Sequence, residues 1–163
     1  MAALTLRGVL GTKATLMSTD MDGLVNNTLA ISSVLAGTGI YNNTAGSSAS
    51  ATTGDGYKRG LLALNLVALG AAPTANSTID VWLLKSIDGT NANFEDGGPT
   101  ITPQRAPDQS FLLDSSRATA EHQEFELQIP QTYFKTLIRN NASGQTLGTG
   151  NTLTLIPVTD QAS

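Results

Sequence analysis

The sequence predicts an all-β protein, an antiparallel β-sandwich or jelly roll of about eight strands. Short runs of alternating apolar and polar residues predict the strands, and clusters of Gly, Pro, Asn and Asp between them predict tight turns. The composition agrees, because Thr suits strands while Asn, Ser and Gly favour turns. At 163 residues the chain has the usual size of one domain, and we assign residues 1–163 to it.

The N-terminal third carries the weakest strand signals. Leu4–Leu6 and Ala14–Met17 are predicted to form a short strand pair about Gly11. Residues 36–56 are almost entirely Gly, Ser, Thr, Asn and Ala, and such a stretch cannot bury enough apolar surface to order itself alone. We therefore expect an N-terminal arm over residues 1–10 and a flexible loop over residues 36–56.

The clearest strand signals lie in the middle of the chain. Residues 57–69 are apolar enough for a buried helix, but Gly60 within this run and turn residues at 73–77 after it favour a strand. Residues 77–85 follow as a second β run, with apolar residues on both of its faces. We predict that 57–69 and 77–85 are neighbouring antiparallel strands.

The C-terminal half predicts further short strands with turns between them. Pro130 ends one strand because proline cannot donate to the ladder, and residues 140–144 form a loop before the last strand. These strands are expected at residues 110–113, 124–129, 133–139 and 151–158. The predicted core consists of the apolar side chains that share the inner face of the runs: Leu62, Leu64, Leu66, Ile79, Val81, Leu83, Phe125, Leu127, Ile129, Leu137, Leu153 and Leu155.

Charge and cysteine content exclude several function classes. The formal net charge is -4 and the 9 Lys and Arg residues are scattered, so we expect no nucleic-acid partner. The absence of Cys excludes disulfides and thiolate chemistry. No stretch approaches the ~18 apolar residues of a membrane-spanning helix, and residues 1–7 do not resemble a secretory signal. We expect no membrane partner and synthesis in the cytoplasm.

Residues that could support catalysis or metal binding are few. His122 is the only histidine, and its polar neighbours predict a solvated loop histidine without catalytic partners. Asp20 and Asp22 precede Gly23 as in a calcium loop, but no closing Glu follows, so an Asp-Gly turn is the better interpretation. Glu124 and Glu126 are expected to serve solubility on an exposed strand face. The sequence thus predicts no enzyme, cofactor or metal.

One short passage predicts a hairpin after the second central strand. Asp88-Gly89 is a hairpin turn signal, and Phe94 can return to pack beneath it. Residues 85–97 resemble turns in discoidin-like and carbohydrate-binding jelly rolls. Because aromatic residues make up only 5% of the chain, this resemblance supports the fold more than sugar binding.

Four passages carry a wider resemblance: Gly60–Leu66, Ile79–Asn91, Phe134–Asn141 and Gly150–Leu155. In these passages the chain resembles small virion structural proteins of tailed bacteriophages, above all the jelly-roll decoration, or cement, proteins of the capsid. The resemblance implies a homo-oligomer, often a trimer, that binds the major capsid protein in many copies and clamps neighbouring subunits. The expected location is the capsid surface of the virion. The alternative is a tail, neck or fibre-associated module, including one that binds host glycans.

The expected contact elements are the N-terminal segment and the loop 36–56. Such segments lose roughly 1–2 kcal/mol of backbone entropy per ordered residue, so they become fixed only where neighbouring subunits supply contacts. The candidate interface residues are Leu4, Leu6, Arg7, Ile40 and Tyr41. An apolar patch repeated around a threefold axis would favour a cement protein, whereas an exposed row of aromatic side chains would favour glycan binding.

Overall fold

The structure is a computed structural model that describes residues 6–10, 13–32, 59–67, 69–86, 94–130 and 132–162, with the main chain alone for 6–10 and 159–162. One short 3-10 helix, η1, spans Thr19–Met21. The strands of these residues are β1 (Leu6–Leu10), β2 (Ala14–Met17), β3 (Leu29–Ile31), β4 (Arg59–Leu66), β5 (Thr78–Ser86), β6 (Gln109–Leu112), β7 (Glu121–Gln128), β8 (Tyr133–Asn141) and β9 (Thr152–Ala162).

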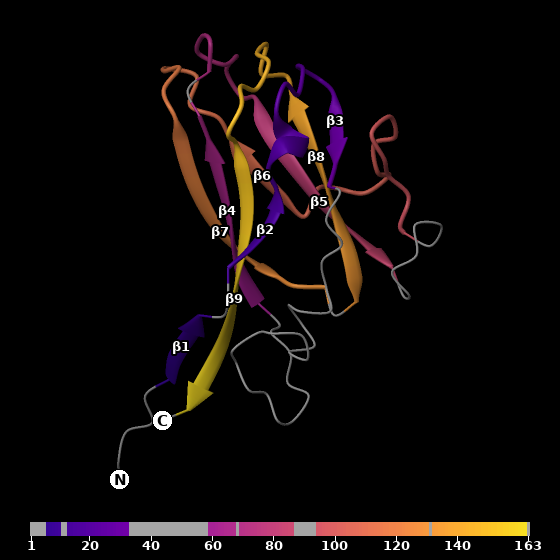
Figure 1. Cartoon of the computed structure of the whole chain (residues 1–163), viewed down its shortest axis with the longest axis vertical. Helices are drawn as coiled ribbons and strands as arrows, with labels where there is room; N and C mark the ends of the chain where they lie inside the picture. The colour runs from indigo at the N-terminus through magenta and orange to yellow at the C-terminus, as the bar shows by residue number, and fades with distance from the viewer. Residues whose placement is uncertain are drawn as a thin grey trace.

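The strands form two antiparallel sheets that face each other (Figure 1). The first sheet has the order β1-β9-β4-β7, with β2 also paired to β9, and the second has the order β3-β8-β5-β6. Apolar side chains of the two inner faces meet in one cluster. The predicted all-β sandwich is therefore confirmed.

The pairing pattern is that of a jelly roll. Strands of the first half pair with counterparts in the second half in reverse order: β1 and β2 with β9, β3 with β8, β4 with β7, and β5 with β6. This is the pairing of one long hairpin whose successive rungs fold alternately into the two sheets. The pairs β4–β9 and β5–β8 then join the rungs side by side.

This topology corrects the prediction that residues 57–69 and 77–85 are neighbouring strands. They form β4 and β5, which lie in opposite sheets, and the chain between Leu66 and Thr78 crosses from one sheet to the other. Alternation and turn residues identify a strand but carry no information about its partner. A turn between consecutive strands is compatible both with a hairpin and with a crossing between sheets.

The predicted strand pair about Gly11 is also wrong. β1 and β2 do not pair with each other; both pair with β9, one after the other along the same edge. In the described residues, β1 pairs with β9 from Val158 to Ala162, and β2 pairs with it from Leu153 to Leu155.

The core lies between the sheets and contains most of the predicted set, including Leu62, Leu64, Ile79 and Leu155, each at most 1% exposed. Gly60 also belongs to this face, because an added Cβ would lie 2.7 Å from Leu155 Cδ1.

Three residues of the predicted core do not lie buried between the two sheets. Phe125 is 41% exposed and Leu127 is half-buried, because both lie on β7, the edge strand of the first sheet. Leu137 is buried, but in a second cluster on the outer face of the second sheet.

That second cluster joins Trp82, Leu84 and Leu137, with Phe94 packed against it. The turn at Asp88-Gly89, beneath which Phe94 was predicted to pack, lies outside the described residues. It is covered by residues 94–108, which we call the strap. The strap approaches closely at Gly97, where an added Cβ would lie 3.1 Å from Leu84 Cδ1. The second sheet is therefore apolar on both faces, in contrast to the first sheet, whose outer face on β7 is polar.

One part of the first sheet projects beyond the sandwich (Figure 1). On β4 the described residues begin at Arg59, and their last pair with β9 is Arg59 with Val158, whereas β1 pairs with β9 from Val158 to Ala162. Residues 6–9 and 159–162 therefore form a two-stranded ribbon, and no other strand of the described chain continues it.

Candidate functional site

The predicted contact residues fall in two groups. Leu6 and Arg7 lie in the projecting ribbon, where they pair with Ala162 and Gln161 of β9. Leu4, Ile40 and Tyr41, and with them the loop 36–56, lie outside the described residues. The structure therefore places part of the predicted N-terminal contact element in the ribbon and gives no position for the rest.

Asp22 has a structural position between two loops. Its Oδ1 accepts a hydrogen bond from the Gly150 N–H at 3.0 Å, and Gly23 follows with a φ of 71°. This is the Asp-Gly turn that the sequence predicts. In the residues with described side chains, no three His, Cys, Asp or Glu residues gather as a group that could hold a metal ion.

His122 differs from its prediction. It lies within strand β7 rather than in a loop, and it has partners. Its Nδ1 is hydrogen-bonded to Asn65 Oδ1 on the neighbouring strand β4, and its Nε2 lies 2.9 Å from Glu124 Oε1. The prediction failed because the polar residues around His122 were interpreted as a loop, whereas they form the solvent face of an edge strand.

The β7 surface, defined as His122, Glu124, Phe125 and Glu126, is the most exposed stretch among the strand side chains that the structure describes. Glu126 forms an ion pair with Arg59 of β4. Phe125 points the other way and meets the buried ring of Phe111 edge-on, with ring centroids 5.4 Å apart. The surface thus offers two carboxylates on one side of the strand and part of an aromatic ring on the other, which suits a binding surface rather than a reaction centre.

We expect the change His122→Ala to alter the free energy of unfolding by no more than about 0.5 kcal/mol. The imidazole is 53% exposed, so water can replace both of its hydrogen bonds. Chemical denaturation followed by tryptophan fluorescence measures the effect. A loss above about 1 kcal/mol would show that the pair with Asn65 is structural.

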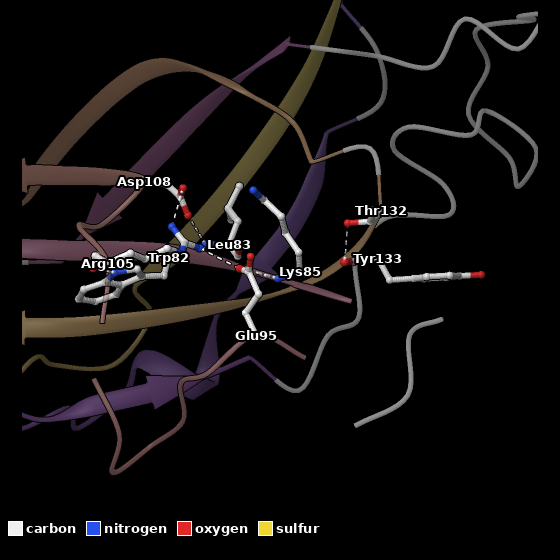
Figure 2. A network of polar contacts seen from close by, with 8 residues as sticks. All are labelled: Trp82, Leu83, Lys85, Glu95, Arg105, Asp108, Thr132 and Tyr133. Atoms are coloured by element: carbon white, nitrogen blue, oxygen red, sulfur yellow. Dashed lines mark hydrogen bonds and ion pairs between the residues drawn. The ribbon is translucent and has the colours of Figure 1, made fainter. Parts of the chain in front are cut away.

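A group of polar residues from the strap closes the open edge of β5 (Figure 2). β6 pairs with Thr78–Val81, and no strand of the described residues lies beside Leu83 and Lys85 on that side. Side chains of the strap take that place: Asp108 Oδ2 accepts from the Leu83 N–H at 2.7 Å, and Arg105 Nη2 donates to the Leu83 carbonyl at 3.1 Å.

The same arrangement repeats two residues further along β5. Glu95 Oε2 accepts from the Lys85 N–H at 3.1 Å, and the Glu95 N–H donates to the Lys85 carbonyl at 2.9 Å. Arg105 joins the two acids, at 2.8 Å from Asp108 and 3.2 Å from Glu95. Nothing in the sequence pattern indicated this cluster, because its members lie in a loop and only the topology shows which main-chain groups need partners.

Replacing Arg105, the cation between Glu95 and Asp108, should loosen the strap. We expect Arg105→Ala to lower the free energy of unfolding by about 1–2 kcal/mol, since it leaves the Leu83 carbonyl unpaired and two carboxylates side by side. Arg117→Ala is a matched control, because Arg117 forms only an exposed ion pair with Asp114; its effect should stay below about 0.5 kcal/mol. Equal losses in the two variants, measured by urea denaturation, would contradict a structural role for Arg105.

The loop between β6 and β7 is held by two acids. Glu121 is buried and accepts a hydrogen bond from the Asp114 N–H at 3.0 Å. Hydrogen bonds from the Ser116 hydroxyl and N–H lower the pKa of Asp114 below its ordinary value. Because this pKa is lower in the folded state, the contribution of Asp114 to stability is present above the unfolded pKa and is lost as the pH falls through the folded one.

The chain matches no protein-family model, no curated protein and no solved structure. Within the described part of the chain, no helix is long and apolar enough to cross a membrane.

Proposed function

We propose that the chain is a capsid decoration protein of a tailed bacteriophage, which binds the assembled lattice of major capsid protein as a homotrimer and stabilises the head. The jelly-roll topology is compatible with this role, because viral structural proteins use that fold, although lectins and enzymes use it too. The resemblance of the passages named above supports the same role.

The observation that carries the proposal is the ribbon of residues 6–9 and 159–162. It contains Arg7 and Asp160 as its only charged residues and extends past the last pair between β4 and β9 in the described residues. A two-stranded ribbon is at best marginally stable in water by itself. Its ordering costs roughly 1–2 kcal/mol per residue in backbone entropy, which contacts with neighbouring subunits can offset. Many such contacts act together when an oligomer binds a repeating lattice.

The exposed aromatic content argues against the glycan-binding alternative. In the residues with described side chains, Phe125 is the one aromatic ring more than a third exposed, whereas Trp82, Phe111 and Phe134 are buried. A sugar-binding platform commonly presents several aromatic faces. One ring at a strand edge fits a contact with protein better.

The double change of Arg7→Pro and Gly8→Pro tests the proposal. Alternate residues of β1 direct their N–H groups toward β9, so one of the two prolines must remove a donor to β9. The sandwich should keep its unfolding midpoint, because this part of the ribbon lies beyond it. Binding to purified heads of the encoding phage, measured by co-sedimentation, should fall at least about tenfold, or by ~1.4 kcal/mol.

The unaltered chain should sediment as a trimer and bind saturably to the heads. A chain that sediments as a monomer and fails to bind heads would contradict the proposal. So would a double variant that binds as well as the unaltered chain, because the ribbon would then have no part in the contact.

A further inference from the structure

The four edges of the two sheets are protected to very different degrees. Along the edge formed by β1 and β2, the register with β9 shifts between Thr15 and Met17. The edge at β3 is only 3 residues long. β6 is 4 residues long, and the strap seals the main chain of β5 beyond it. Short strands, breaks, bulges and covering segments are the usual means of preventing an edge from pairing with another chain.

Within the part of the chain that the structure describes, β7 has none of these protections along most of its length. It runs for 8 residues in regular register with β4. On its other side, the Gln123 side chain donates to the Leu112 carbonyl at 2.7 Å, and Glu121 accepts a hydrogen bond from the Asp114 N–H. These contacts cover the first residues of the β7 edge, from Glu121 to Gln123. From Glu124 to Gln128, no strand of the described chain pairs with that side. Its outward N–H and C=O groups are arranged as a template for one more strand.

The side chains of β7 disfavour a second copy of the same strand. When two β7 strands pair antiparallel and continue the sheet, Glu124 lies opposite Glu126 in one centred register and opposite the other Glu124 in the adjacent one. Like charges directly opposite one another destabilise a strand pair. The edge is therefore protected against its own copy but not against a strand of opposite charge.

We propose that the free edge of β7 is a docking site for an extended segment of a partner protein in which Lys or Arg alternates with apolar residues. The basic side chains lie opposite Glu124 and Glu126, each about half exposed, and the apolar ones cover Phe125, which is 41% exposed. Main-chain hydrogen bonds supply the affinity and alternate side chains the specificity, as in β-strand addition generally. This site extends the proposed function by naming a second contact surface, and it rests on observations independent of the ribbon.

A synthetic ten-residue peptide of alternating Lys and Val, with a fluorescent label, is the probe. We expect the full chain to bind it with an affinity that falls as salt is added, and to bind a Glu-Val peptide at least about tenfold more weakly. Hydrogen exchange measured by NMR should show that alternate amides between Glu124 and Gln128 slow on binding, because a pleated strand directs every second N–H to the new neighbour.

Two controls separate strand addition from simple charge attraction. A Lys-Val peptide N-methylated at alternate residues keeps its charge but cannot bond to the edge, and it should bind at least about fivefold more weakly. Glu124→Lys should weaken binding of the unmethylated peptide about fivefold to tenfold. The same charge change far from β7, in Asp96→Lys on the strap, should leave binding within about twofold.

Equal binding of the methylated peptide, or equal effects of the two lysine variants, would overturn the proposal, as would a failure of the β7 amides to slow. If the Lys-Val peptide does not bind while the chain still binds phage heads, this docking site is refuted and the proposed function stands. If it binds while the chain does not bind heads, the docking site stands and the proposed function is refuted.

Discussion

Replacing Phe111 with alanine should lower the free energy of unfolding by about 3–5 kcal/mol, the usual cost of deleting a buried phenylalanine ring. Phe111 is fully buried on β6, between the two sheets, and it belongs to the apolar cluster that holds them together. The short strand β6 cannot move far to fill the cavity, because β5 holds it over 4 residue pairs. Urea denaturation followed by circular dichroism would measure the loss.

Phe125→Ala is the matched control for this prediction. The two rings touch, but Phe125 is 41% exposed, and its removal should cost only about 1–2 kcal/mol. Comparable losses would mean that Phe125 is packed more tightly than the structure has it. The exposed edge on which the docking site depends would then be in doubt.

Trp82→Ala should cost a similar 3–5 kcal/mol, although Trp82 points away from the core between the sheets. The indole is 2% exposed, packs with Leu84 and Leu137 beneath the strap, and donates from Nε1 to the Arg105 carbonyl at 3.1 Å. We expect the strap to loosen as well. The amides of Glu95 and Asp108, which bond to Lys85 and Val81 of β5, should exchange faster with solvent.

Trp82→Phe separates packing from the hydrogen bond. It keeps most of the apolar volume and removes only the donor to Arg105, so we expect a loss of about 1 kcal/mol. If the free energy of unfolding of the Trp82→Ala variant is close to that of the unaltered chain, the prediction is contradicted. It would show that the second cluster contributes little and that the strap is held by its polar groups alone.

The alternating pattern predicted the fold class and most core positions, but not the partners of the strands. Leu153 and Leu155 alternate with Thr152 and Thr154, and both leucines are buried as predicted. The prediction that β4 and β5 pair with each other was wrong, because a jelly roll places most consecutive strands in opposite sheets. No residue between Leu66 and Thr78 marks the crossing. The order of pairing depends on contacts distant in sequence, which local periodicity does not record.

The β7 surface shows a different limit. Phe125, Leu127 and Ile129 share one face of the run, so all three were predicted to be buried, yet exposure increases from Ile129 to Phe125. Burial there depends on whether a second sheet lies opposite. Phe125 lies on β7, the edge strand of the first sheet, and its ring meets Phe111 of β6 edge-on instead of lying between the two sheets.

The second cluster was missed for a related reason. Asp80, Trp82 and Leu84 lie on the outer face of β5, and an outer face is expected to contact water. Phe94 and the rest of the strap, residues 94–108, cover that face. The polar residues that fix the strap, Arg105 and Asp108, have no periodic pattern, so their role depends on the free main chain of Leu83.

The central claim is our proposal that this chain decorates a phage head, and electron cryomicroscopy of the virions that this proposal implies would test it most directly. The account predicts jelly-roll density at the threefold positions between hexamers, with the ribbon of β1 and the end of β9 against neighbouring subunits. A trimer at each of these positions would agree with the proposal. Heads that lack this density while the chain is found in the tail, or virions that contain no copy of the chain, would contradict it.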